Sequence, residues 1–61
     1  MIKQEVIVRK EYIKNSNRTQ ETYYHYIDRI STFANSKGED NIISISYPEK
    51  DIAIVVYKEE E

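Results

Sequence analysis

The sequence of 61 residues contains no cysteine and no tryptophan, and only one glycine, one proline and one histidine. Without cysteine the chain forms neither disulfides nor thiolate metal sites, and this composition favours an intracellular location. A single glycine excludes the glycine-rich phosphate loops of Walker and Rossmann proteins. Because a zinc site needs several histidine or cysteine ligands, the sequence also predicts no zinc site.

A strong charge of either sign and a long apolar run are missing as well. Nine basic and eleven acidic side chains give a net charge of −2, whereas surfaces that bind nucleic acid are clearly basic. No run reaches the length of a transmembrane helix, and the first five residues do not resemble a signal peptide. We therefore expect a cytoplasmic protein that binds no membrane, with a charge that argues against nucleic acid as a partner.

The last third of the chain has the clearest pattern. Ile43, Ile45 and Tyr47 alternate with two serines, which predicts a strand over 42–47 with one buried side. Pro48 and the three polar residues after it predict a short hairpin connection.

The stretch Ile52–Tyr57 is apolar at every position and predicts a strand over 51–58. One side of this strand carries Ile52, Ile54 and Val56, and the other side carries Ala53, Val55 and Tyr57. Because a strand that is apolar on both sides needs cover on both sides, we place it in the centre of a sheet.

The first half of the chain predicts one more strand and one helix. Ile2, Val6 and Val8 share one side of a strand over 2–9, with Ile7 on the opposite side. The polar segment that follows predicts a loop. An apolar stripe at helical spacing then predicts a helix over 18–35, with the stripe formed by Tyr23, Ile27, Ile30, Phe33 and Ala34.

Both ends of this helix have expected caps. Asn17 and Gln20 have the spacing of a capping box at the start, and Gly38 suits a left-handed cap at the end. Glu59–Glu61 predict a solvated tail.

These elements predict a single α+β domain over residues 1–61, with the order β-α-β-β. The three strands form an antiparallel sheet in the order 1-3-2, and the helix lies on one face. We expect the other face to be apolar and to form a homodimer or a higher oligomer. The residues expected at this oligomer interface are Ile7, Ile42, Ala53, Val55 and Tyr57.

The sequence shows no constellation of residues for catalysis. His25 and Asp28 are expected on the outer side of the helix, and no motif marks a serine nucleophile. Glu39, Asp40 and Asp51 lack the spacing of a calcium loop and are typical of turns. We therefore expect a protein that is not an enzyme and that uses no cofactor and no metal.

Six tyrosines are a high number for so short a chain. Tyr23 and Tyr47 are assigned to the core, whereas other tyrosines are expected to keep their hydroxyl groups near the surface. Two interpretations stay open, because such side chains either pack at core edges and oligomer seams or bind a ligand. A nucleotide-like anion would stack on the rings and pair with cations. The residues expected to bind it are Tyr24, Tyr26, Tyr57, Arg9, Arg29 and Lys50.

Three segments carry a resemblance to a known family. Met1–Lys3, Ile43–Tyr47 and Ala53–Lys58 resemble a small sporulation protein family of spore-forming bacilli, of similar length. The resemblance implies no activity and no catalytic residues, and it suggests a sporulation-associated structural or regulatory interaction protein. The chain is also similar in type to small oligomeric phage proteins, some of which capture host signalling nucleotides at subunit interfaces.

Together these observations predict a non-catalytic, homo-oligomeric binding module. It binds either another protein, for instance a host protein, or a small nucleotide-like ligand at subunit interfaces, as a phage signal sponge does. The sporulation-associated interaction protein is the alternative, and a weak nucleic-acid binder comes third.

Overall fold

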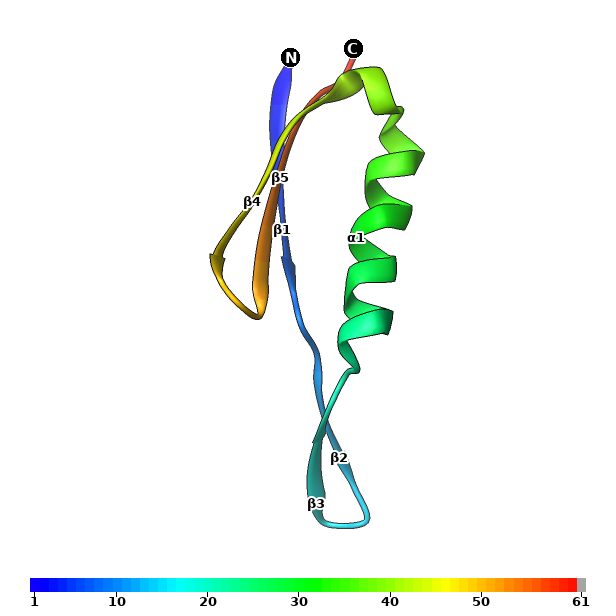
Figure 1. Cartoon of the computed structure of the whole chain (residues 1–61), viewed down its shortest axis with the longest axis vertical. Helices are drawn as coiled ribbons and strands as arrows, with labels where there is room; N and C mark the ends of the chain where they lie inside the picture. Colours follow the sequence, from blue (N-terminus) through cyan, green and yellow to red (C-terminus); the bar gives the residue numbers. More distant parts are fainter. Residues whose placement is uncertain (61) are drawn as a thin grey trace.

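The computed structural model of the chain describes residues 1–60 (Figure 1). This part of the chain contains five strands, one α-helix and one turn of 3-10 helix. In chain order they are β1 (Ile2–Val8), β2 (Glu11–Lys14), β3 (Asn17–Gln20), α1 (Tyr23–Lys37), η1 (Glu39–Asn41), β4 (Ile42–Glu49) and β5 (Ile52–Lys58).

β5 is the central strand of an antiparallel sheet with the order β1-β5-β4 (Figure 1). This confirms the α+β class, the single helix and the sheet order that the sequence predicts. β1 pairs with β5 in one unbroken register, in which Ile7 lies opposite Ala53. β4 pairs with β5 less regularly, since its register shifts twice, between Ile42 and Ser44 and between Ser46 and Glu49.

A second, two-stranded sheet was not expected from the sequence. β2 and β3 form a hairpin in which Lys14 lies opposite Asn17, so that Asn15 and Ser16 make the turn. Both turn residues have positive φ angles, 52° and 65°, as a type I′ turn requires. The hairpin extends beyond the end of the helix and gives the molecule its longest dimension, 44 Å (Figure 1).

The helix begins at Tyr23, five residues later than the predicted range 18–35. Thr22 caps it, because its hydroxyl accepts a hydrogen bond of 3.2 Å from the backbone N–H of His25. The predicted capping box at Asn17 and Gln20 is wrong, because β3 contains both residues. The predicted cap at the other end of the helix agrees better with the structure. Gly38 has a positive φ of 94°, and its N–H donates to the Asn35 carbonyl.

The core lies between α1 and one face of the sheet. Its buried side chains are Ile7, Tyr26, Ile30, Ala53, Val55 and Tyr57, with Phe33 and Ile42 packed against them. The rings of Phe33 and Tyr57 meet edge to face, with centroids 5.4 Å apart. Tyr23 and Tyr47, which the sequence assigns to the core, are 43% and 53% exposed.

The structure corrects the predicted oligomer interface. All of its residues lie on the helix side of the sheet, where four are buried and Ile42 is half-buried: Ile7, Ile42, Ala53, Val55 and Tyr57. The sequence pattern is symmetric here, because β5 is apolar on both sides. We attribute the choice of side to Ala53, which leaves room for the large ring of Tyr26 in the same cluster.

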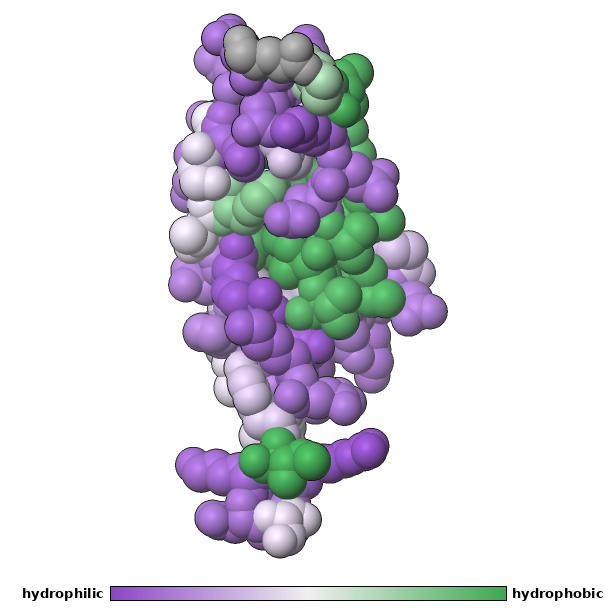
Figure 2. Space-filling view, turned by 180° about the vertical axis from the view of Figure 1, so that it is seen from behind, coloured by the Kyte–Doolittle hydropathy of each residue, from purple (hydrophilic) through white to green (hydrophobic). Residues whose placement is uncertain are grey.

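The opposite side of the sheet is therefore the uncovered one. We name it the open face and define it by the side chains that alternate with the buried ones: Ile2, Val6, Val8, Ile52, Ile54 and Val56. Val6 and Val8 are about half exposed, at 50% and 51%. Seen from behind, the molecule shows a contiguous apolar area over the sheet (Figure 2).

The segment after β5 is bonded to the residue that precedes β1. Glu59 exchanges backbone hydrogen bonds with Met1, at 2.8 and 3.0 Å. Its carboxylate lies 3.0 Å from Lys3 Nζ and 3.6 Å from Lys37 Nζ. Glu59 is thus not part of a solvated tail as predicted, and Glu61 lies outside the described residues. Within residues 1–60, no helix is long and apolar enough to cross a membrane.

Candidate functional site

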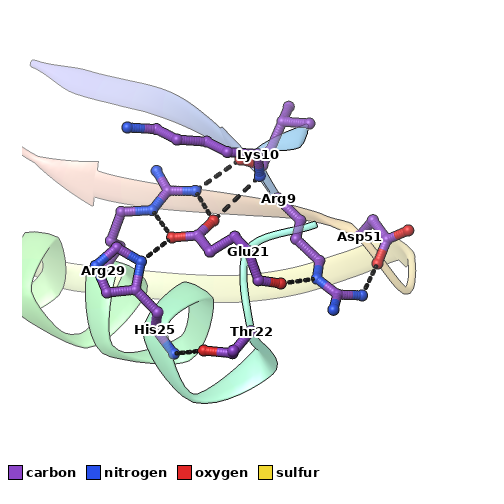
Figure 3. A network of polar contacts seen from close by, with 8 residues as sticks. Arg9, Lys10, Glu21, Thr22, His25, Arg29 and Asp51 are labelled. Atoms are coloured by element: carbon purple, nitrogen blue, oxygen red, sulfur yellow. Dashed lines mark hydrogen bonds and ion pairs between the residues drawn. The ribbon is translucent and has the colours of Figure 1, made fainter. Parts of the chain in front are cut away.

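The most strongly linked polar residue is Glu21, between β3 and α1 (Figure 3). Its side chain is buried, and Arg29 binds it in a bidentate manner, with Nε 2.7 Å from Oε2 and Nη2 2.7 Å from Oε1. The backbone N–H of Lys10 donates to Oε1 at 3.1 Å, and His25 Nδ1 contacts Oε2. The carboxylate thus receives donors from the helix and from the segment that follows β1.

These donors favour the ionised form of Glu21. The hydrogen bonds from Arg29 lower the pKa of this carboxyl from 4.5 to about 2, and the Lys10 amide and His25 act in the same direction. Burial acts in the opposite direction but is the weaker effect. Glu21 is therefore a fixed anion at neutral pH, and not a proton donor or acceptor.

Arg9 links three parts of the chain beside Glu21 (Figure 3). Its Nε donates to the Glu21 carbonyl at 2.6 Å, and its Nη1 donates to Asp51 Oδ1 at 3.3 Å. Its guanidinium also lies 4.2 Å from the centroid of the Tyr23 ring. The Tyr23 hydroxyl in turn donates to the Lys50 carbonyl at 3.3 Å.

This polar cluster fastens the hairpin, the helix and the β4–β5 turn together. Its acids are neutralised by arginine, so no carboxylate of the cluster is left over for general acid–base chemistry. Among the described residues, no group of three or more histidine or acidic side chains could hold a metal ion. The arrangement is that of a structural cluster that connects these three elements.

The six predicted ligand-binding residues do not form one site, although Arg9 and Arg29 both bind Glu21. Tyr26 is fully buried and Tyr57 is 7% exposed, so neither ring offers a surface on which a ligand could stack. Arg9 and Arg29 are engaged in the polar cluster, and Lys50 lies in the β4–β5 turn. Tyr24 is 91% exposed on the helix.

Glu21 lies within the predicted helix range 18–35 and was not predicted as a site residue. A signal was nevertheless present, because Glu21, His25 and Arg29 are spaced four residues apart, as residues on one helical face are. Glu21 lies just before the first turn of α1 and still reaches both partners.

Two shallow hollows lie on the surface of the described residues. The larger, of about 510 Å³, runs between β1 and α1. Its lining residues are Glu5, Val6, Ile7, Val8, Asp28, Arg29, Thr32, Phe33 and Ser36. The smaller, of about 460 Å³, lies between the C-terminal part of α1 and β4. Both are open, and the first follows the outer edge of β1.

The surfaces that stand out are thus the open face of the sheet and the outer edge of β1. Both are open surfaces, and neither has the enclosed shape of a small-molecule pocket. A comparison with protein-family models finds no matching family, and comparisons with curated proteins and with solved structures find no match either.

Proposed function

We propose that this protein is a non-catalytic protein–protein binding module that acts in the cytoplasm as a homo-oligomer, associated through the open face. The observation that carries the proposal is that β5 is apolar on both sides, while α1 covers only the side of Ala53, Val55 and Tyr57. A chain of this size is near the lower limit for independent folding, so burying the second side adds stability that one copy lacks.

The open face suits a second copy of the same chain. A two-fold axis places the same patch of both copies in contact, so one apolar surface covers another. On β4, Ser44 and Ser46 lie opposite Val56 and Ile54 of β5. Their polar side chains give the patch a polar border. Apolar centres with polar borders are typical of protein interfaces.

The nucleotide-like ligand finds less support, because Tyr26 and Tyr57 lie in the core and both arginines are engaged. We therefore give protein–protein association preference over ligand capture. The resemblance to the sporulation protein family stays a prediction, and it is compatible with a protein that acts through association.

The test is the mass of the protein in solution, measured by sedimentation equilibrium. We expect wild type to be a dimer or larger, and Ile54→Glu to reduce its mass, because the charge would be buried in the interface. Tyr24→Glu is the matched control, since Tyr24 lies 91% exposed on the helix and should not affect the mass. A wild-type protein that is monomeric at millimolar concentration contradicts the proposal. Val55 is unsuitable as a test position, because it is fully buried beneath the helix.

A further inference from the structure

The two outer edges of the sheet are built differently. β4 contains Pro48 and two shifts of register, and irregularities of this kind protect an edge strand from pairing with another chain. β1 has neither, because all seven of its residues pair with β5 in one register. It is a regular edge strand, and such an edge is a template for a further strand.

The hydrogen bonds show which backbone groups face this free edge. Met1 and Glu59 bond to each other, and the Arg9 N–H donates to the Asp51 carbonyl at 2.8 Å. Inward and outward groups alternate along an antiparallel strand, so the odd-numbered residues of β1 bond to β5. The even-numbered residues therefore point outward. Of these, the Val8 carbonyl accepts from Arg29 Nη2 at 2.7 Å, which leaves the groups of Ile2, Gln4 and Val6 for a partner.

We propose that β1 of a second copy pairs antiparallel with this edge, with Gln4 opposite Gln4. Outward-facing residues must lie opposite one another in an antiparallel ladder, and this register satisfies the rule by placing Ile2 opposite Val6. The same register places Lys3 of each copy opposite Glu5 of the other, so two lysine–glutamate ion pairs form on the helix side of the sheet.

Neighbouring registers lack this charge complementarity. Centring on Glu5 places two glutamates opposite each other, and centring on Lys3 places two lysines opposite each other. Centring on Val6 brings Lys3 opposite Arg9 and requires the carbonyl of Val8, which Arg29 already occupies. The register centred on Gln4 is thus selected by charge as well as by hydrogen bonding.

The surface beside the edge leaves room for a strand. The hollow between β1 and α1, of about 510 Å³, is bordered on the helix by Asp28, Thr32 and Ser36, which are exposed and short. A two-fold axis perpendicular to the sheet would join both sheets into one and keep both helices on the same face. This contact uses the edge and not the open face, so it does not depend on the function proposed above.

The test exchanges charges in the background of Ile54→Glu, which removes association through the open face. In the homodimer, Lys3→Glu brings two acidic side chains opposite each other, and Glu5→Lys brings two basic ones opposite each other. Each variant alone should therefore dimerise at least roughly fivefold more weakly. An equimolar mixture of the two should form a heterodimer, because one copy then carries two acidic side chains at positions 3 and 5 and the other copy carries two basic ones.

 In the proposed register, both cross-strand pairs of this heterodimer join an acidic side chain of one copy to a basic side chain of the other. The variant that carries both changes should recover the homodimer.

Three further measurements complete the experiment. Lys3 also lies 3.0 Å from Glu59 Oε2, so Glu59→Gln tests whether the loss of that ion pair alone alters association. Hydrogen exchange in the unmutated chain supplies a readout that needs no variant, since pairing protects the Gln4 and Val6 amides against exchange at high protein concentration. A circular dichroism spectrum confirms that each variant is folded.

Recovery of affinity in the mixture, together with protected Gln4 and Val6 amides, supports the proposal. It is overturned if the background variant is monomeric at all concentrations, if the single changes leave affinity unaltered, or if the mixture fails to associate. It is also overturned if these amides exchange freely in the assembled protein, as they would if the edge served a foreign peptide instead. If Ile54→Glu leaves the mass of the wild type unaltered, the open-face proposal fails, and the edge proposal is judged by the charge exchange alone.

Discussion

Glu21 illustrates how one side chain can hold a small fold together. Its carboxylate is buried and accepts hydrogen bonds from Arg29 on the helix and from the backbone of Lys10, just after β1. Since these donors stabilise the charged form, the attachment of the hairpin to the helix depends on the ionisation of this group.

We expect the stability of the protein to fall in acid because of this group. The folded pKa of Glu21 is about 2 and its ordinary value is 4.5, so its contribution is complete above pH 4.5 and is lost as the pH falls toward 2. Urea unfolding between pH 7 and pH 2.5 measures this dependence. Glu21→Gln should be less stable at pH 7, and its stability should fall less steeply in acid. Some dependence on pH should remain in this variant, because Lys3 also lowers the pKa of Glu59. An unaltered slope in Glu21→Gln would contradict the assignment.

Tyr26 presents the opposite case, a polar atom that lacks a partner. Its side chain is completely buried, and within residues 1–60 its hydroxyl has no hydrogen-bond partner. Tyr26→Phe removes only this hydroxyl, so we expect the free energy of unfolding to stay equal or to rise by about 0.5–1 kcal/mol. Tyr26→Ala removes the ring as well and should cost roughly 3–5 kcal/mol. Chemical denaturation measures both, and a loss above about 1 kcal/mol in Tyr26→Phe would show that the hydroxyl is satisfied.

Among the elements, those with strong local signals could be predicted from the sequence. The alternation in β4, the turn after Pro48 and the apolar run of β5 depend on neighbours in the chain, and they give the correct sheet order. The covered face could not be predicted, because β5 carries apolar residues on both sides and only the fit of α1 decides between them. The predicted interface lies on the wrong side for this reason.

The prediction of where the helix begins failed for a different reason. Asn15 and Ser16 are suited both to a loop before a helix and to a turn with positive φ angles, and the structure uses the second option. The polar strands of the hairpin have no apolar alternation that would have identified them. The candidate site was missed because its polar cluster joins residues that are far apart in the sequence, from the segment after β1, from α1 and from the β4–β5 turn. Such long-range pairs leave no pattern in the sequence, and only the spacing of Glu21, His25 and Arg29 gave a signal.

A pair of substitutions distinguishes the observed start of the helix from the predicted one. Thr22→Ala removes the hydroxyl that caps the His25 N–H, and it should reduce the free energy of unfolding by about 1 kcal/mol. Gln20→Ala removes the residue expected in the capping box and should cost less than about 0.5 kcal/mol, because Gln20 is exposed in β3. Thermal unfolding of the two variants, with Thr22→Ser as a conservative control, provides the comparison. Equal losses in both variants would contradict the cap at Thr22.

Considered as a whole, the molecule presents two surfaces that are compatible with one closed assembly. Pairing through the β1 edge joins two sheets side by side and keeps both open faces on the same side. Two such pairs could then stack through their open faces, with all helices outside. Two kinds of two-fold contact that meet in this way give a closed tetramer with D2 symmetry, a common form among homo-oligomers.

This assembly makes a prediction that neither contact makes alone. Wild type should be a tetramer, Ile54→Glu a dimer through the edge, Glu5→Lys a dimer through the open face, and the combination of both changes a monomer. Light scattering after size exclusion gives the four masses directly. Because the two contacts share none of these side chains, their effects on affinity should add to within about 0.5 kcal/mol. A wild-type mass that keeps rising with concentration would mean that the two axes do not close, since repeated contacts without closure generate filaments.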